Sequence, residues 1–588
     1  MVHGGRLSAI PLRVETAGPP DQSRRSRPER LTTASHNHAV TGWRRIITVS
    51  QPVSETPSHT DYDAIVVGAG MGGIYGVHRL VSQGLSVLGL EGAPDVGGVW
   101  YHNAYPGARV DIESASYCYF FDRDLYSEWE WSERYAAQPE ILAYLRHVAD
   151  RFDVRKHFRF NTYMASGTWN EELGRYLVTT ESGESFTARF LVMCTGQLSK
   201  PRPPTFPGLD EFAGEWYQTS AWPQEGAELE GKRIAVIGTG SSGVQAITAL
   251  APVAGHLTVF QRTPNYSVPA RNRPADTRKR TRFADNIDQV WEELMTTGAG
   301  LILPPTRGAS SQYTPEQIEQ LLEERWAFGG QSLLSLFTDQ GIDPEVNEVV
   351  AQFVRERVLD TVTDPETAEA LLPDEYPIGV RRLCIDTGYY ETFNRDNVSL
   401  VDIKADPIER ITENGIQLTS GRDVELDVIV FALGFNAFTG ALDQAGVRNE
   451  AGLAPSDRWA RGPRTFLGLT THGFPNLFLV TGPASPSVLA NMNVANVQHL
   501  DFVGDLITYM DEHGYQRVEP TQQAEDEWTE HAASIAEPML RRKHDNYMVH
   551  VNHDDGSRVF IPYAGGFNEY VDRANQVVAD GYAGFDFK

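Results

Sequence analysis

The sequence contains little cysteine and no long apolar run, and each shortage argues against a class of protein. Its 588 residues include three cysteines, Cys118, Cys194 and Cys384, which stand far apart and form no CxxC pair. A disulfide framework or a dithiol redox centre is therefore not indicated, and a reducing cytoplasm is the expected location. No apolar run is long enough to cross a bilayer, so no membrane association is expected.

Basic residues are also in short supply. The 51 lysines and arginines face 78 aspartates and glutamates, which gives a formal net charge of −27. A chain this acidic repels nucleic acids and anionic membranes, so neither is expected as a partner. The composition is otherwise that of a globular protein, and the length predicts several domains. No sequence feature defines an oligomeric state, and a monomer or a loose homo-oligomer is expected.

Residues 1–60 differ from the rest of the chain. They carry eight arginines against four acids, are rich in Ser, Thr and Pro, and have no hydrophobic period. This composition predicts a disordered extension. The segment lacks the apolar core of a secretory signal, and a flexible extension explains it better than a transit peptide does. A start codon assigned too far upstream is an alternative, in which case the mature protein lacks these residues.

A short apolar strand at 63–67 runs directly into a glycine-rich motif. The motif has the spacing GxGxxG, formed by Gly68, Gly70 and Gly73. Such glycines allow a tight turn, backbone approach to a pyrophosphate and close helix–strand packing. A second strand at 85–90 ends in Glu91, about 20 residues after the first glycine, where an acid meets ribose hydroxyls. This agreement favours a dinucleotide site over a glycine-rich turn without a ligand.

The same pattern occurs a second time, with a different residue at its end. A strand at 233–237 enters a GxGxxG motif formed by Gly238, Gly240 and Gly243. The next strand, 257–260, is followed by Arg262 instead of an acid. A guanidinium suits the 2′-phosphate of NADPH, whereas Glu91 suits a free 2′-hydroxyl. A structural ion pair is the alternative role for Arg262. The two sites together predict an oxidoreductase that holds FAD and is visited by NADPH.

Between these motifs and the C-terminus the patterns change from strand–helix alternation to helices and back. An amphipathic run contains Phe283, Ile287, Trp291 and Leu294 on one face. Further helix starts are predicted where a capping residue precedes a proline, at Thr314, Asp343 and Asp364. Strand character returns at 398–401, 426–434 and 476–482, and the last two are expected to close the flavin domain.

The predicted fold class is therefore α/β, with two Rossmann-like dinucleotide-binding domains and a helical insertion. The FAD domain is expected to be discontinuous and to enclose the NADPH domain, which the helices interrupt. The expected boundaries are 1–60 for the disordered extension, 61–205 and 395–588 for the FAD domain, 206–274 and 375–394 for the NADPH domain, and 275–374 for the helical insertion.

Two longer motifs carry more information than the glycines do. Residues 97–111 read GGVWYHNAYPGARVD, and residues 212–223 read FAGEWYQTSAWP. The first resembles, at every fixed position, the motif [AG]GxWxxxx[FY]P[GM]xxxD of type I Baeyer–Villiger monooxygenases. The second resembles that family's fingerprint FxGxxxHxxxW[PD], with Gln218 in place of the histidine. The resemblance extends from about residue 61 to the C-terminus.

The resemblance implies a monooxygenase reaction that uses both cofactors. In that family NADPH reduces FAD, O₂ adds at flavin C4a, and the resulting peroxide attacks a ketone to give an ester or lactone. A peroxide anion requires a fixed positive charge with hydrogen-bond donors. Arg382 matches the family's essential arginine and Asp111 the carboxylate that positions it, while a surface salt bridge is the alternative role for Arg382. Gln218 completes the expected catalytic set.

The resemblance also assigns residues to cofactor and substrate. The residues expected to bind FAD or NADPH are Gly68, Gly70, Gly73, Glu91, Val99, Trp100, Tyr101, His102, Arg109, Val110, Asp111, Tyr117, Met164, Met492, Gly238, Thr239, Gly240, Ser241, Ser242, Gly243, Gln245, Arg262, Thr263, Arg381, Arg382 and Tyr547. Those expected to shape the substrate pocket are Ser487, Val488 and Leu489, although Val488 and Leu489 fit an ordinary core equally well. His550 and His553 lack supporting ligands, so no metal site is expected.

Three positions depart from the family pattern. Gln218 replaces the fingerprint histidine, Tyr547 a tryptophan and Leu433 a threonine. Glutamine cannot carry a proton's charge, so a titration-linked role of that position is lost. The leading hypothesis is oxidation of a ketone, expected to be cyclic. The alternatives are a flavin monooxygenase that makes N- or S-oxides and a flavoprotein with impaired turnover.

Overall fold

The computed structural model describes residues 60–552 and 555–588. The extension predicted at 1–60 therefore lies outside the described residues, apart from Thr60, where the first strand begins. No helix within the described ranges is both long enough and apolar enough to cross a membrane.

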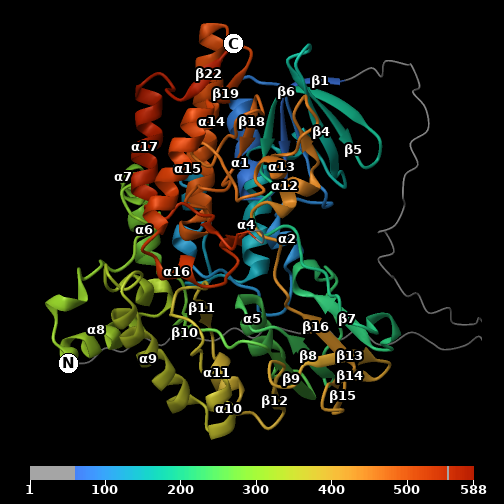
Figure 1. The fold of residues 1–588 in the computed structure, drawn as a ribbon, viewed down its shortest axis with the longest axis vertical. Coiled ribbons are helices and arrows are strands. Elements are labelled where there is room, and N and C mark those ends of the chain that lie inside the picture. Colours follow the sequence, from blue (N-terminus) through green and yellow to red (C-terminus); the bar gives the residue numbers. More distant parts are fainter. Residues whose placement is uncertain (1–59, 553–554) are drawn as a thin grey trace, which may run out of the picture. The chain divides into compact units, whose positions relative to one another are not determined.

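A mixed sheet of eight strands occupies the upper part of the view in Figure 1. Its strand order is β17-β4-β5-β6-β1-β2-β3, and β18 pairs with β6 beside this path. The central strand β1 is parallel to both of its neighbours, β2 and β6. The strands are β1 (Thr60–Val67), β2 (Val87–Leu90), β3 (Phe158–Arg159), β4 (Met164–Asn170), β5 (Arg175–Thr180), β6 (Ser185–Met193), β17 (Val447–Arg448) and β18 (Leu477–Leu479).

A second sheet of five strands lies in the lower part of Figure 1. All its neighbouring strands are parallel, in the order β12-β9-β8-β16-β7. These strands are β7 (Glu215–Gln218), β8 (Arg233–Ile237), β9 (His256–Gln261), β12 (Val398–Asp402) and β16 (Val428–Phe431). Each glycine motif joins a strand to a helix, β1 to α1 (Met71–Ser82) and β8 to α5 (Ser241–Leu250). The predicted α/β fold with two dinucleotide-binding sheets is confirmed.

The boundary expected at residue 395 is wrong. β12 and β16 belong to the five-stranded sheet, where β16 pairs with both β7 and β8. The segment 426–434 therefore does not close the larger sheet, whereas β18, within the predicted strand 476–482, does join it. The four residues of β16 are all buried. An apolar strand of this kind has the same sequence pattern in either sheet, because its pairing partners lie far away along the chain.

Helices fill the segment between β10 (Ser267–Pro269) and β11 (Cys384–Asp386). Three of them begin where a capping residue precedes a proline, as the sequence predicts. The helices are α6 (Thr277–Asp285), α7 (Ile287–Met295), α8 (Pro315–Phe328), α9 (Pro344–Thr361) and α10 (Pro365–Ala370). The side chains of Thr314, Asp343 and Asp364 accept hydrogen bonds from backbone N–H groups of the first turns. The run from Phe283 to Leu294, however, is two helices that meet at Asn286.

The remaining elements connect and cover the sheets. They are α2 (Val99–His102), α3 (Arg123–Glu128), α4 (Gln138–Arg151), β10 (Ser267–Pro269), β11 (Cys384–Asp386), α11 (Tyr389–Thr392), β13 (Ile408–Thr412), β14 (Gly415–Leu418), β15 (Asp423–Glu425), α12 (Gly440–Gln444), α13 (Pro455–Arg458), α14 (Met492–His513), β19 (Val518–Pro520), α15 (Gln522–Ala536), α16 (Leu540–Lys543), β20 (Val549–Val551), β21 (Arg558–Phe560), α17 (Phe567–Ala579) and β22 (Phe585–Phe587).

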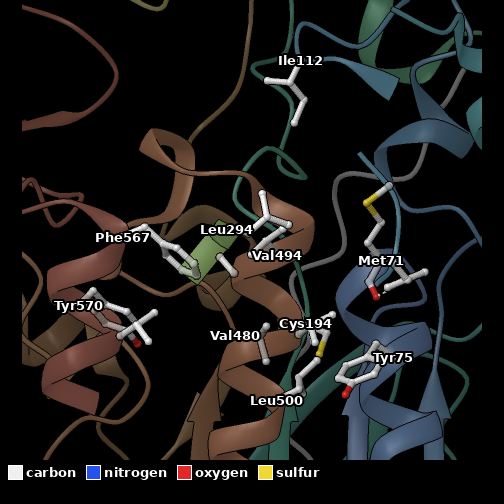
Figure 2. Close-up of a cluster of buried hydrophobic side chains, with 14 of the residues drawn as sticks. Met71, Tyr75, Ile112, Cys194, Leu294, Val480, Val494, Leu500, Phe567 and Tyr570 are labelled. Carbon is white, nitrogen blue, oxygen red and sulfur yellow. Dashed lines mark hydrogen bonds between the residues drawn. The ribbon is translucent and has the colours of Figure 1, made fainter. Parts of the chain in front are cut away.

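Helices α1 and α14 pack side by side and run in the same direction. Along them, Gly72 lies near Asn496, Gly76 near Leu500, and Arg79 pairs with carboxylates further along α14. A Cβ at Gly76 would lie only 3.1 Å from a Leu500 methyl carbon, so glycine permits this close approach. Figure 2 shows Tyr75, Cys194 and Leu500 close together in this core. The N-termini of both helices therefore lie at the same end.

Candidate active site

The first and third glycines of each motif are required by the backbone itself. Gly68 has a φ of +103° and Gly238 a φ of +108°, a region that L side chains rarely adopt. A Cβ at Gly73 would overlap the carbonyl oxygen of Gly68, and the equivalent overlap occurs between Gly243 and Gly238. These glycines let each helix begin directly against its strand.

The middle glycine of each motif faces open space instead. A Cβ at Gly70 would meet only the backbone of Gly98, at 3.5 Å, and a Cβ at Gly240 would meet nothing within 4 Å. Both glycines are N-cap residues, and neither supplies a side chain to the helix N–H groups. Free N–H groups beside an open cradle fit a pyrophosphate. The residues present therefore fit one dinucleotide at each motif.

Glu91 stands where the ribose of the first dinucleotide is expected. Its Oε2 accepts a hydrogen bond from the Ala69 N–H at 2.6 Å, and its Oε1 accepts one from Ala93 at 2.7 Å. Burial raises the pKa of Glu91, and the backbone N–H bonds oppose that rise. These bonds hold the carboxylate beside the glycine turn, and a carboxylate has lone pairs enough to accept from a ribose hydroxyl as well.

The first part of the long motif lies against this glycine turn. Gly97 donates its N–H to the Ala69 carbonyl at 2.9 Å, and the φ of Gly98 is +55°. The short helix α2 then places Trp100, whose Nε1 donates to the Tyr117 hydroxyl at 3.0 Å. Burial raises the pKa of Tyr117 to about 12. The motif thus builds one wall of the first dinucleotide site.

The second part of the long motif reaches the other dinucleotide site. Gln245 of α5 accepts a hydrogen bond from the Tyr105 hydroxyl at 2.8 Å and donates to the Arg109 carbonyl at 3.0 Å. The fingerprint segment contacts the long motif as well, because the backbone N–H of Trp222 donates to the His102 carbonyl at 3.2 Å. Residues 97–111 therefore connect the two glycine motifs, through a backbone bond to Ala69 at one end and through the Gln245 side chain of α5 at the other.

The long motif ends at Asp111, which pairs with Arg382. The Arg382 Nη2 donates to Asp111 Oδ1 at 2.8 Å, and Nε donates to the other carboxylate oxygen. A third donor, Nη1, bonds to the Val488 carbonyl at 2.8 Å. Burial alone lowers the pKa of Arg382, but the charge and hydrogen bonds of Asp111 raise it above its ordinary value. The guanidinium thus stays charged and is fixed on one side within a half-buried ion pair.

Near the second glycine motif lie two arginines that have no carboxylate partner among the described residues. Arg262 follows β9, is exposed, and forms no ion pair with any described residue. Arg381 lies over the Tyr376 ring, with its guanidinium carbon 4.5 Å from the ring centre. The Tyr376 hydroxyl in turn donates to the Pro264 carbonyl at 2.9 Å. Cations without a partner among the described residues fit a phosphate at this place.

Other expected cofactor residues take several positions. Thr239 donates from its hydroxyl to the Thr263 carbonyl at 3.1 Å, and the Ser241 hydroxyl lies 3.6 Å from the Cys384 sulfur. Met492 is the first residue of α14. Tyr547 stacks on Phe438 at 6.3 Å, and burial raises its pKa although Arg382 and Arg541 oppose the rise.

Some expected site residues point elsewhere. The Arg109 guanidinium pairs with Glu133, and the Val110 and Met164 side chains are buried in hydrophobic cores. Gln218 ends β7 and donates from Nε2 to the Arg202 carbonyl at 2.6 Å. Among the described residues no hydrogen bond joins it to Arg382 or Asp111, and its catalytic role stays a prediction. A shared motif indicates only that a residue matters, not that it touches the reacting atoms.

The three residues expected to shape the substrate pocket have different environments. Ser487 is fully buried and donates to the Gln197 side chain at 2.8 Å, while Val488 supplies the carbonyl that holds Arg382. Leu489 lines a cavity of about 230 Å³. Sequence patterns missed Arg541 in the same cavity, because it belongs to no motif. The described residues contain no group of metal-ligating side chains, and His553 lies outside them.

The contrast between the two glycine positions predicts different defects. Gly243→Ala should destabilise the fold by about 1–3 kcal/mol, because the methyl group overlaps the Gly238 carbonyl. Gly240→Ala, at a φ of −78°, should fold normally but bind NADP⁺ at least about tenfold more weakly. Thermal unfolding and titration of the holoenzymes with NADP⁺ measure both effects. Equal NADP⁺ affinity in Gly240→Ala and the parent enzyme would contradict the pyrophosphate cradle.

Arg262 should select NADPH over NADH. Arg262→Ala removes the free guanidinium, so kcat/KM for NADPH should fall about tenfold to a hundredfold while that for NADH changes little. Steady-state NAD(P)H oxidation with both coenzymes measures the ratio. Arg422→Ala, an exposed arginine on the turn before β15, is the matched control. An equal loss with both coenzymes would rule out a phosphate contact.

Comparison with known proteins agrees with this arrangement. Residues 63–295 match the family model described as flavin-binding monooxygenase-like. The chain is 39% identical over 525 residues to a Baeyer–Villiger monooxygenase of Pseudooceanicola batsensis, which covers 89% of this chain and 95% of the relative. It is 38% identical over 531 residues to cyclohexanone 1,2-monooxygenase of an Acinetobacter species, with coverage of 90% and 97%.

A solved structure matches the fold over nearly the same length. The crystal structure of OTEMO in complex with FAD and NADP superposes with a TM-score of 0.86 at 38% identity, covering 90% of this chain and 99% of that one. Identity and coverage at this level establish the family. The chain belongs to the flavin-binding monooxygenase-like proteins and, within them, to the FAD-containing, NADPH-dependent Baeyer–Villiger monooxygenases.

Proposed function

We propose that the protein uses NADPH and O₂ to oxidise a cyclic ketone to a lactone, with the reaction at the Arg382–Asp111 pair. The observation that carries the proposal is the position of this pair. Asp111 ends the motif that contacts both glycine sites. Arg382 comes two residues after Val380, which lines a cavity. Bound FAD, once reduced, supplies the activated oxygen.

Arg382 supplies charge and hydrogen bonds to the reaction. A guanidinium has five N–H donors, and here two go to Asp111 and one to the Val488 carbonyl. The remaining donors are available to an oxygen that gains negative charge as the ketone reacts. Asp111 positions the guanidinium and keeps it charged, so this donor is not lost at alkaline pH.

The two sheets have separate tasks in this proposal. The eight-stranded sheet, with Glu91, holds FAD, and the five-stranded sheet, with Arg262 and Arg381, receives NADPH and its 2′-phosphate. The specific contacts that support this division are the Glu91 bonds beside Gly70 and the unpaired guanidinium of Arg262.

Gln218 is a positioning residue in this proposal. Its side-chain amide donates to the backbone carbonyl of Arg202, in a connection between the sheets. The backbone N–H of Arg202 in turn donates to the Gly434 carbonyl at 3.0 Å. Asn436 likewise donates its N–H to the Lys200 carbonyl at 2.8 Å. Glutamine keeps this contact without titrating, so it fixes the connection at any pH.

Product analysis tests the proposed function. The purified holoenzyme is given NADPH, air and either cyclohexanone or thioanisole, and products are identified by mass spectrometry. Caprolactone formed in proportion to the NADPH consumed is the expected result. Sulfoxide without lactone would favour heteroatom oxidation instead, and a flavin that NADPH fails to bleach would show that the protein does not turn over.

A further inference from the structure

The cavity next to the Arg382 site is walled by segments from several parts of the chain. It is formed by Gly298, by residues within 334–347 and 378–380, and by the C-terminal part of the chain, and its volume is about 230 Å³. Two connections tie it to the reaction centre. Val380 lines it and lies two residues before Arg382, while Leu489 follows Val488, whose carbonyl accepts from Arg382. Arg382 is not itself a lining residue, so the cavity adjoins the ion pair through these two neighbours.

Most of the cavity wall is apolar. Its large apolar side chains are Leu334, Ile378, Val380, Leu489, Met539, Leu540 and Phe567. Such a wall suits the hydrocarbon part of a substrate. A charged group in it therefore requires an explanation, because a cation in apolar surroundings is costly without a partner.

Arg541 is that charged group. It lines the cavity and donates from Nε to the Gly379 carbonyl at 2.6 Å, which holds the guanidinium against the wall. Within the described ranges no carboxylate lies within ion-pair distance of it, and neither Nη atom has a hydrogen-bond partner. The adjacent Arg542, in contrast, pairs with Glu537 at 2.8 Å. The two Nη atoms are not enclosed, so a ligand can reach them.

The electrostatics of Arg541 agree with a missing counter-charge. Burial lowers its pKa, Tyr547 opposes this shift, and the positive charge of Arg382 lowers the pKa further. Asp111 neutralises Arg382 but not Arg541. The positive charge of Arg541 therefore has no balancing carboxylate among the described residues. An anion in the cavity would balance it.

A second polar group in the same wall also lacks a partner. Gln340 lines the cavity and is only 2% exposed, yet neither of its side-chain polar atoms bonds to any described residue. Asn347 fixes this part of the wall by donating from Nδ2 to the backbone carbonyls of Gln340 and Ile378, at 3.0 and 2.9 Å. Buried amides are nearly always hydrogen-bonded, so Gln340 is a further indication of a polar ligand.

We propose that this cavity binds the carboxylate of a keto acid, with Arg541 as its partner, while Arg382 addresses the ketone at the other end. The proposal rests on the proposed oxidation of ketones and adds to it a substrate class. A keto acid of this class has an apolar ring or chain between the carbonyl that reacts and the carboxylate at the other end. Arg541 is then a specificity-determining residue, and Gln340 offers its amide as a second donor.

The test compares an acid with its neutral analogue. The probes are 4-oxocyclohexanepropanoic acid and its primary amide, which differ little in shape but differ in charge. In the holoenzyme the acid should have the higher kcat/KM. Arg541→Met should lower the acid-to-amide ratio of kcat/KM at least about tenfold, since a hydrogen-bonded charge contact is lost. Arg541→Lys, which retains the charge, should lose less.

Binding of the acid to the oxidised holoenzyme, measured by calorimetry, should weaken by a similar factor. Arg542→Met is the matched control and should leave the ratio unchanged, because Arg542 pairs with Glu537 outside the cavity. Flavin content verifies that each variant is folded. Equal kcat/KM for acid and amide, or an equal drop in Arg541→Met and Arg542→Met, would overturn the keto-acid proposal. Failure of the enzyme on cyclohexanone as well as the probes would instead overturn the proposed function.

Discussion

The ion pair between Arg382 and Asp111 joins two segments that lie far apart in the sequence. Asp111 ends the loop that packs on the glycine turn at Gly70 and on α5 through Gln245. Arg382 follows the cavity wall at Val380 and is also held by the Val488 carbonyl. Breaking a partly buried pair leaves a charge without its partner, which is costly. The pair therefore requires the motif loop, the segment before β11 and the segment before α14 to be in place together.

The two glycine motifs use one backbone solution for two ligands. In each, the first and third glycines are fixed by close backbone contacts and the second leaves open space at a helix N-terminus. What differs is the residue after the next strand, Glu91 in one case and Arg262 in the other. In the proposed function this buried acceptor and this exposed cation recognise different riboses. A reaction that uses both dinucleotides requires both sites to lie near one centre. Residues 97–111 join the two sites, through their hydrogen bonds to Gln245 of α5.

Local patterns predicted much of this arrangement, and pairing between distant segments limited the rest. Strands that enter GxGxxG and capping residues before proline, such as Asp343, are encoded within a few positions, and the structure contains them. The strand at 428–431 was assigned to the wrong sheet because its partners, β7 and β8, lie about 200 residues away. Gln218 was grouped with the reacting residues through its motif alone. No local sequence pattern marks Arg541, since its proposed role follows from the absence of a carboxylate partner among the described residues.

The dependence of the site on one ion pair is tested most directly by a double-mutant cycle. Lactone formation in a single turnover is measured for Arg382→Ala, Asp111→Ala and the double variant, with NADPH-driven flavin reduction followed in the same samples. If Asp111 acts through Arg382, the double variant should lose no more activity than Arg382→Ala alone. Flavin reduction should continue in all three. Independent, multiplying losses, or lactone formation at the original rate in Arg382→Ala, would contradict the account.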